Sequence, residues 1–413
     1  MEIFRKMSFA DSTGDAIPFY HEGKYHIFSL TSPPGTTVYP ERLRTTWSHS
    51  VSEDLVHWKE LPTALYPGEG EEPDASGVWT GSVIYGEGQF HAFYTGYCLT
   101  AEFQQTICHA TSEDGITWKK DTANPVITPI TELYEKLDWR DPYVFYNEED
   151  ENYWILISAR RLDMPITRRG CIVLYRSKDL KNWSYYGPIY SPGHTNCPEC
   201  PEMYRMGNHW YLSYSRFSEF VNTIYRVSES PFGPWRKPKK DGIGGRRFYA
   251  AKSMQNEEGR RFYFGWAHDR AQQSDTGEWY WGGTFCVPHE VVPSENGELD
   301  VKLPREYEQI FGRKTEWEYL PVLGDAKVYG KNTIALHAVE SCSYGFLKHK
   351  EESYMLSCSI IPREAYDSFG ILLKSDKEAS GCLYLEFDMA MQRVSFLNLP
   401  MGVDPFWVQS CQA

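Results

Sequence analysis

Three stretches of the sequence place a carboxylate directly before an apolar strand and a hairpin. They are "STGDAIPFYHEGKYHIF" with Asp15, "LDWRDPYVFY" with Asp141, and "ECPEMYRMGNHWYLSYS" with Glu199. A single acid at the end of a strand is usually a solvated cap. Three acids at matching positions can meet when a fold gathers their strands around one axis, so together they are a candidate catalytic site.

The chemistry that such acids perform is glycoside hydrolysis, which needs two carboxylates flanking the bond that breaks. One is ionised and attacks as the nucleophile, while the other is held protonated and acts first as acid and then as base. A third carboxylate beside a guanidinium, as Asp141 is beside Arg140 in the sequence, would stay charged and hold sugar hydroxyls. Glu202, three residues after Glu199, is a further acid in the third stretch.

A phrase that occurs four times predicts the elements that position these acids. "HSVSEDLVHW" (49–58) returns as "HATSEDGITW" (109–118), "YRSKDLKNW" (175–183) and "YRVSESPFGPW" (225–235). Five short aromatic strands, each after a turn signal, accompany it before residue 270. This recurrence predicts a β-propeller with five blades, whereas the alternative is a large β-sandwich of unrelated hairpins. The acid of the phrase is expected to cap a turn, and its Trp to fill the gap between blades.

The sequence changes character after residue 310. "LPREYEQIFGRKTEW" reads as a linker, and "SYMLSCSIIP", "FGILLKSD", "CLYLEFDMA" and "RVSFLNL" are alternating strands that predict a small β-sandwich. We therefore expect an all-β chain with a propeller over residues 1–310, a linker over 311–322 and a sandwich over 323–413. The sandwich is short, so we expect it to be truncated or to have unusual last strands. "PITELYEKL" forms at most one short helix.

Composition and charge exclude several classes of partner. The 413 residues contain no apolar stretch of membrane-spanning length and no apolar signal core at the start, so we expect a cytoplasmic protein. A net charge of −14 without a basic run argues against nucleic acid. The 14 Trp and 29 Tyr suit sugar binding, because the apolar face of a sugar packs on an aromatic ring. We therefore expect a small carbohydrate as the partner and leave the oligomeric state open.

No cofactor is indicated by the sequence. Its ten Cys are irregularly spaced, and the one CxxC pair, Cys197 and Cys200, has no second ligand pair at a recognisable distance. HExxH and glycine-rich phosphate loops are also absent. We interpret the cysteines as free thiols and expect no metal.

At its acids the sequence resembles glycoside hydrolase family 32, the invertase and fructanase family. "GDAIPFYHEGKYHIF", "WRDPYVF" and "ECPEMY" are similar to the family's Asp-Pro-Asn-Gly, Arg-Asp-Pro and Glu-Cys-Pro-Asp motifs, and they stand in the family's order within residues 8–310. The resemblance implies a five-bladed propeller, a β-sandwich and retaining chemistry. It implies that Asp15 is the nucleophile, Glu199 the general acid and base, and Asp141, aided by Arg140, the transition-state stabiliser.

The same resemblance implies which residues line the sugar subsite. These are Trp47, Trp79, Ser82, Tyr249 and Trp266. For the Trp residues among them, the alternative role is packing between blades.

Four departures from the family pattern concern the substrate more than the catalyst. The family's Asn before the nucleophile is Gly14, its Gln at the end of the first hairpin is Ser29, and its acid before "FYAA" is Arg247, while Thr80 replaces the Ser of Trp-Ser-Gly-Ser. "GDAIPFY" is more similar to the levan fructotransferase branch than to ordinary invertases.

The expected function is release of fructose from short β-fructofuranosides, such as inulobiose-type substrates, by double displacement. One alternative is a fructosyltransferase of the levan fructotransferase type, in which a sugar hydroxyl replaces water. Another is an arabinan- or xylan-active five-bladed hydrolase, whose acids would stand roughly 6.5–9.5 Å apart rather than about 5–5.5 Å. A third is a carbohydrate-binding propeller without catalysis, which would have lost an essential acid.

Overall fold

The chain is built almost entirely from antiparallel β-strands, as predicted. The computed structural model describes residues 4–218, 220–273, 277–338, 342–351, 353–363, 368–375, 381–400 and 410–412. Within these ranges the α-helical content is one short helix, α1 (Arg305–Gln309). The segment "PITELYEKL" does not form the short helix that the sequence allowed, because strand β9 (Tyr134–Asn147) begins inside it.

The strands between residues 13 and 302 form four sheets. The first group is β1 (Thr13–His21), β2 (Lys24–Thr31), β3 (Thr46–Ser52) and β4 (Trp58–Leu65). The second and third sheets are β5 (Gly77–Gly86), β6 (Gln89–Tyr97), β7 (Gln105–Ser112) and β8 (Lys119–Lys120), then β9 with β10 (Asn152–Arg161), β11 (Gly170–Ser177) and β12 (Ser184–Tyr190). The fourth sheet is β13 (Glu199–Met206), β14 (His209–Arg216) and β15 (Asn222–Ser228).

The last strands of this region join the first group. They are β16 (Tyr249–Gln255), β17 (Arg261–Arg270), β18 (Trp279–Phe285), β19 (His289–Pro293) and β20 (Leu299–Lys302). Strand β18 pairs with β1 through Thr13 and Gly283, so strands from the two ends of the region share one nine-stranded sheet.

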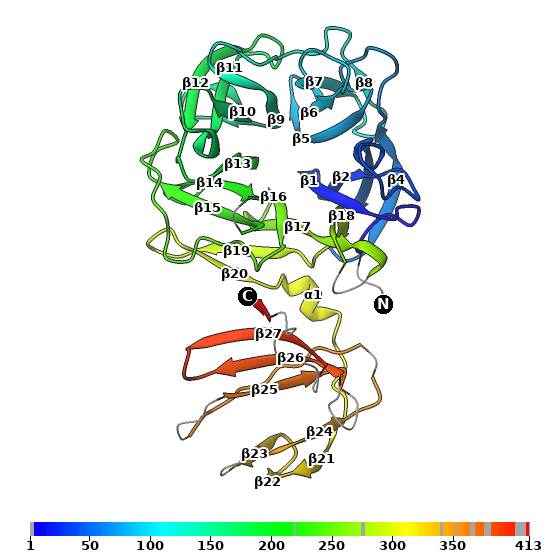
Figure 1. The fold of residues 1–413 in the computed structure, drawn as a ribbon, viewed down its shortest axis with the longest axis vertical. Coiled ribbons are helices and arrows are strands. Elements are labelled where there is room, and N and C mark those ends of the chain that lie inside the picture. Colours follow the sequence, from blue (N-terminus) through cyan, green and yellow to red (C-terminus); the bar gives the residue numbers. More distant parts are fainter. Residues whose placement is uncertain are drawn as a thin grey trace. The chain divides into compact units, whose positions relative to one another are not determined.

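Five strands lie innermost and form a closed cycle of neighbours. β1 contacts β5, β5 contacts β9, β9 contacts β13, β13 contacts β16, and β16 contacts β1. Figure 1 shows these strands around a common centre, with their partners further out. Because β1, β9 and β13 carry Asp15, Asp141 and Glu199, the cycle brings the three predicted acids toward one place.

The hairpins that flank this centre turn where the sequence predicted. Glu22 and Gly23 between β1 and β2, and Glu87 and Gly88 between β5 and β6, have positive φ angles of 46°, 77°, 50° and 81°. Two successive positive φ values match the right-handed twist of the flanking strands, and glycine adopts the second at no steric cost.

The repeated phrase has the structural role that was predicted for it. Asp54 accepts hydrogen bonds from the backbone N–H groups of Val56 and His57, at 3.0 and 2.7 Å. Asp114 and Asp179 cap the corresponding turns in the next two copies. In the fourth copy the hydroxyl of Ser230 takes this place and accepts from Phe232 N at 3.2 Å.

The Trp of each copy packs on strands that are distant in the sequence. Trp118 makes an edge contact with Phe28, and Trp183 one with Phe93, at ring-centroid distances of 5.8 and 5.3 Å. Trp58 contacts Phe264 in the same manner at 6.1 Å. Trp235 packs against the hydrophobic cluster that contains residues of β10 and β14. The phrase therefore joins strands that lie far apart in the sequence, and its aromatic residues contribute to the core.

The remainder of the chain is also β-structure. Residues 305–365 form a compact unit of their own, and residues 366–413 group with the first 304. The first of these segments holds two pairs of antiparallel strands, β21 (Glu318–Leu323) with β24 (Tyr344–Lys348), and the hairpin of β22 (Asp325–Tyr329) with β23 (Thr333–His337). A four-stranded sheet follows, with β25 (Ser368–Leu373), β26 (Gly381–Asp388), β27 (Arg393–Pro400) and β28 (Ser410–Gln412) in sequence order. Strand β21 begins within the segment predicted as a linker.

No helix in the described parts of the chain has the length and apolarity to cross a membrane.

Candidate active site

Each of the three acids lies at an irregularity in its strand. The pairing register shifts between Gly14 and Ala16 in β1, beside Arg140 in β9, and between Glu199 and Glu202 in β13. A β-bulge bends its strand and turns a side chain away from the regular alternation. Asp141 itself has a φ of +58°, which is uncommon for a residue with a side chain. The bulges therefore direct the acids toward the centre of the cycle.

Asp15 is 8% exposed and accepts hydrogen bonds on both carboxylate oxygens. Trp266 Nε1 donates to its Oδ1 at 2.8 Å, and the hydroxyl of Thr80 donates to its Oδ2. The thiol of Cys200 lies 3.8 Å from Oδ2. Burial, and then the charge of Glu199, raise the pKa of Asp15, while the donors from Thr80 and Trp266 lower it. The donors thus favour the ionised form that a nucleophile needs.

Asp141 is held by a backbone N–H on β13 and by a side-chain hydroxyl on β6. Its Oδ2 accepts from Cys200 N at 2.9 Å, and its own N–H donates to Thr95 Oγ1 at 2.8 Å. Arg140 Nε lies 3.8 Å from Oδ2. Burial raises the pKa of Asp141, the guanidinium of Arg140 lowers it, and Asp15 raises it further. The two hydrogen bonds fix the position of Asp141, and the guanidinium favours the charged form that a group holding sugar hydroxyls needs.

Glu199 is the most open of the three acids, with 21% of its side chain exposed. Arg140 Nη2 donates to its Oε1 at 2.9 Å, and the hydroxyl of Tyr249 donates to its Oε2. Burial raises the pKa of Glu199 more than the guanidinium of Arg140 lowers it. A carboxyl with a raised pKa that still reaches solvent has the properties of a general acid.

The sequence predicted that the guanidinium of Arg140 would act on Asp141, but its hydrogen bonds are made to other residues. Besides Glu199, it binds Asp138 Oδ1 at 2.5 Å and Gln105 Oε1 at 3.2 Å. Asp138 and Gln105 were not singled out from the sequence, because nothing in their local pattern marks them. Arg140 therefore links Glu199 to β7 and β9.

Of the five predicted sugar-lining residues, Tyr249 and Trp266 contact the acids directly and pair with each other across β16 and β17. Trp79 is partly exposed; it stacks on Tyr97 at 3.9 Å and donates to Leu43 O at 2.9 Å. It therefore keeps surface available for a ligand.

Trp47 and Ser82 lie deeper. The indole of Trp47 is fully buried and donates to Trp79 O at 2.9 Å. Ser82 Oγ accepts from Val144 N at 2.9 Å and so joins β5 to β9. Both residues support the strands that carry site residues, and their direct contact with a sugar stays a prediction.

Glu202 belongs to a separate network. It is fully buried and accepts from the backbone N–H of Ser253 at 2.6 Å and from Arg261 Nη1 at 3.2 Å. The choice of Glu199 over Glu202 for the acid and base therefore agrees with the contacts of both residues.

Metal ligands are not grouped in this site. Cys197 and Cys200 are buried free thiols. Within the described ranges, no three His, Cys, Asp or Glu side chains are arranged to hold a metal ion.

The region that contains these three acids matches a known protein family. The model described as the glycosyl hydrolases family 32 N-terminal domain matches residues 15–302, more than half of the chain. The chain belongs to glycosyl hydrolase family 32. The resemblance of its motifs to this family is thereby confirmed.

Individual family 32 relatives match over most of this chain. It is 29% identical to raffinose invertase of Escherichia coli over 316 residues, which are 70% of this chain and 62% of that protein. It is 29% identical to levanase of Bacillus subtilis over 337 residues, or 73% of this chain and 46% of that protein. The chain thus spans less than two thirds of the length of these curated relatives.

Solved structures share the fold. Fructan 1-exohydrolase IIa from Cichorium intybus superposes with a TM-score of 0.67 at 20% identity, covering 96% of this chain and 80% of that one. Exo-inulinase from Aspergillus awamori gives 0.68 at 19% identity, covering 99% and 85%.

The departure from the family 32 pattern at Gly14 has a steric cause. A Cβ built on Gly14 would lie 2.5 Å from the Cζ2 atom of Trp281. Trp281 in turn packs edge-on against Trp266, with ring centroids 5.7 Å apart. The indole of Trp281 therefore occupies space that the family's Asn side chain would need.

The other three departures also have contacts that explain them. Thr80 supplies the hydroxyl that binds Asp15. Ser29 is buried and exchanges a hydrogen bond of 2.8 Å with Ser48. Arg247 stacks on Trp279, with its guanidinium carbon 3.3 Å from the ring centroid.

Trp279 lies at the edge of the site, and two guanidinium groups stack on its ring. It is 41% exposed, and the guanidinium of Arg270 lies 3.8 Å from its ring centroid, beside that of Arg247. His268 connects this group to the acids, because its ring is 6.3 Å from Trp279 and 4.2 Å from Trp266. Burial, and then the charge of Arg247, lower the pKa of His268 to about 3, so it is neutral near pH 7.

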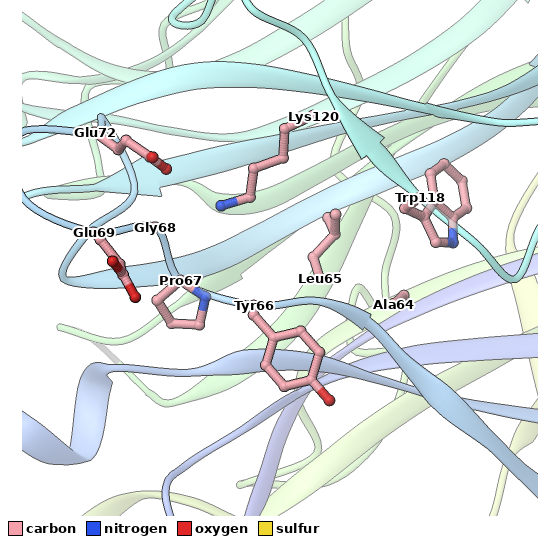
Figure 2. A pocket seen from close by; sticks show the side chains of 9 residues that line it. All are labelled: Ala64, Leu65, Tyr66, Pro67, Gly68, Glu69, Glu72, Trp118 and Lys120. Atoms are coloured by element: carbon pink, nitrogen blue, oxygen red, sulfur yellow. The ribbon is translucent and has the colours of Figure 1, made fainter.

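A separate hollow lies outside the acid cluster (Figure 2). Its volume is about 400 Å³, and Figure 2 shows Glu69 and Glu72 on one side and Trp118 on the other. Lys120, which also lines it, is paired with Asp74 at 2.6 Å. The hollow contains none of the residues predicted for catalysis or sugar binding, and we assign it no role.

Proposed function

We propose that this chain hydrolyses β-fructofuranosides by double displacement. The observation that carries the proposal is the meeting of Asp15, Asp141 and Glu199 at one centre, each with a set of fixed hydrogen-bond donors. Family membership supports the fructoside as substrate class, since relatives are named invertase and levanase.

The first half of the reaction forms a covalent intermediate. A carboxylate oxygen of Asp15 attacks the anomeric carbon of the fructosyl unit, and the bond to the leaving-group oxygen breaks. Glu199 gives its proton to that oxygen as it departs. Asp141 holds hydroxyls of the fructosyl ring, and its negative charge stabilises the positive charge that develops on the sugar in the transition state.

In the second half, the ionised Glu199 takes a proton from water. The resulting hydroxide oxygen bonds to the anomeric carbon, and the bond to Asp15 breaks. Glu199 is then protonated and Asp15 ionised, as at the start. In a transferase of the levan fructotransferase type, a sugar hydroxyl would take the place of water with the same residues.

The proposal includes a five-bladed propeller followed by a β-sandwich. The closed cycle of β1, β5, β9, β13 and β16 supports five blades, with β18 and β1 joining the last blade to the first. In this arrangement every inner strand ends at the same mouth, which is how acids from residues 15, 141 and 199 come together.

A second candidate substrate is a phosphorylated disaccharide. Arg247 and Arg270 place two guanidinium groups on the exposed Trp279 at the edge of the site. Guanidinium groups bind phosphate through charge-assisted hydrogen bonds. Relatives from Zymomonas mobilis and Escherichia coli are named sucrose-6-phosphate hydrolase.

A product assay tests the substrate class. The chain is incubated with sucrose, sucrose 6-phosphate, inulobiose, levanbiose, short inulin and arabino-oligosaccharides, and the sugars are separated by chromatography. Free fructose from a fructoside supports the proposal, and a higher kcat/KM for the phosphorylated disaccharide, lost in Arg270→Gln, supports the second candidate. Release of arabinose alone, or no product from any fructoside, would overturn the substrate class.

A further inference from the structure

Lys252 is a fully buried cation that the proposed reaction has not used. It lies on β16 and is 1% exposed. Its Nζ donates a hydrogen bond to Gly81 O on β5, and it stands 5.3 Å from the ring centroid of Tyr143 on β9. An ammonium group is costly to bury, so a retained one needs negative partners or a function.

The two residues that Lys252 contacts, Gly81 and Tyr143, lie next to residues of the proposed reaction. Gly81 follows Thr80, whose hydroxyl binds Asp15. Tyr143 is two residues after Asp141 on the same strand. A Cβ on Gly81 would lie 2.0 Å from Phe93 O, so this part of β5 is fixed by close backbone contact as well. Lys252 on β16 thus contacts both β5 and β9, close to Thr80 and Asp141.

The groups whose charge acts on Lys252 come from three inner strands, β1, β9 and β13. They are the carboxylates of Glu202, Asp141 and Asp15, and the thiol of Cys200. Glu202 is already paired with Arg261 at 3.2 Å, and Glu199 with Arg140 at 2.9 Å. Asp15 accepts hydrogen bonds from the neutral donors Trp266, Thr80 and Cys200. Arg140 Nε lies 3.8 Å from Asp141 Oδ2, and Lys252 is a second buried cation whose charge acts on both Asp141 and Asp15.

We propose that Lys252 is a positioning residue, whose buried ammonium fixes the Gly81 carbonyl next to Thr80 and, together with Arg140, supplies the charge that lets Asp141 and Asp15 be ionised at the same time. The inference rests on the proposed function, because it assigns the group that this same site uses to keep its nucleophile and stabiliser charged.

The direction of the effect follows from the surrounding groups. Burial lowers the pKa of Lys252, while Cys200, Glu202, Asp141 and Asp15 raise it again. In return, the cation lowers the pKa of Asp141. Removing the cation must therefore raise the pKa of the carboxyls it faces, so that they are protonated at a higher pH.

Two variants separate the charge from the hydrogen bond. Lys252→Met removes both, whereas Lys252→Gln keeps an N–H donor toward Gly81 O. We expect the acid limb of the pH profile of kcat/KM to move up by about one pH unit in both variants, with a larger loss of kcat in Lys252→Met. Lys120→Met, which removes a cation paired with Asp74 outside the acid cluster, is the matched control and should leave the profile in place.

A second readout needs no substrate. The free energy of unfolding of wild type and Lys252→Gln is measured from pH 8 to pH 4. The variant should have a lower free energy of unfolding than the wild type at pH 8, and this difference should become smaller as the pH falls. The reason is that the carboxyls without a neighbouring cation become protonated, so that they are no longer buried as charges. This readout tests the inference even if the wild type releases no fructose, an outcome that would sink only the proposed function. An acid limb that stays in place in an active variant, or a deficit that is constant with pH, would overturn the role of Lys252.

Discussion

Trp266 Nε1 donates a 2.8 Å hydrogen bond to Asp15 Oδ1, joining residues from the two ends of the catalytic region. The indole is fully buried and its N–H can only donate, so it favours the ionised carboxylate. The pKa of Asp15, which burial raises, is lowered by this contact. This bond between two distant strands therefore helps to keep the carboxyl of Asp15, the proposed nucleophile, ionised.

Replacing Trp266 by Phe should remove that donor and keep most of the ring. A hydrogen bond to a charged group contributes about 1.5–3 kcal/mol, so kcat/KM should fall about 10- to 100-fold. The acid limb of the pH profile should move to higher pH. Trp118→Phe is the control, because Trp118 packs on Phe28 between sheets. Equal losses in both variants would show that the effect is general packing.

Arg140→Gln should move both limbs of the pH profile, because Arg140 lowers the pKa of Asp141 as well as that of Glu199. The guanidinium of Arg140 lowers the pKa of Glu199, against the larger effect of burial. Without it the pKa of Glu199 rises, so the protonated acid persists to higher pH and the alkaline limb of kcat/KM moves up. Turnover at the optimum should fall about 100-fold, since a donor in the site is lost.

The control for this variant is Arg160→Gln. Arg160 pairs with Glu135 at 2.7 Å and with Asp138 at 3.3 Å. It should change stability and leave both limbs of the profile unchanged. An alkaline limb that moves down in Arg140→Gln would contradict the assignment of Glu199 as the acid.

Restoring the family's residue at position 14 should be harmful in this chain. Gly14→Asn places a side chain where Trp281 lies, 2.5 Å from the expected Cβ. Overpacking of this kind costs about 1–3 kcal/mol of stability. The double variant with Trp281→Ala should recover part of that loss, which thermal unfolding of the four members of the cycle measures. Additive effects of the two substitutions would refute the steric explanation.

Two histidine pairs should make the fold sensitive to acid. His26 Nδ1 lies 3.0 Å from His49 Nε2, and His91 Nδ1 lies 2.9 Å from His109 Nε2. Burial lowers the pKa of His26 and His91 to about 4 and that of His49 to about 3. The unfolded chain therefore binds more protons than the folded one below pH 6.5.

The stabilisation from neutral histidines is complete above pH 6.5 and is lost as the pH falls toward 4. Each extra proton bound by the unfolded chain contributes a slope of about 1.4 kcal/mol per pH unit. Urea unfolding at a series of pH values measures this slope, and His91→Gln should make it shallower. A variant with the same slope as the wild type would show that this pair does not titrate on unfolding.

The sequence was sufficient for the parts of the fold that repeat. Asp54, Asp114 and Asp179 cap their turns as predicted, because a Ser-x-Asp turn is a local motif whose hydrogen bonds span three residues. The three acids were found because each precedes an apolar strand in a known family motif. Their burial and their donors depend on strands far apart in the chain.

Long-range partners were the part that sequence reasoning missed. Thr80 was noted only as a departure from the family, yet its hydroxyl binds Asp15. Cys200 was interpreted as an inert thiol, yet its N–H binds Asp141 at 2.9 Å. Lys252 has no local signal at all. Each of these contacts joins different inner strands at a bulge, and a bulge cannot be located from alternation of residue types.

The most direct test of the account is the stereochemistry of transfer to methanol. The chain is incubated with sucrose in dilute methanol, and the methyl fructofuranoside is identified by NMR, alongside Asp15→Asn and Glu199→Gln. Double displacement through Asp15 predicts the β anomer from wild type and a loss of several orders of magnitude in both variants. The α anomer, or an Asp15→Asn variant that keeps its turnover, would contradict the assignment of Asp15 as the nucleophile.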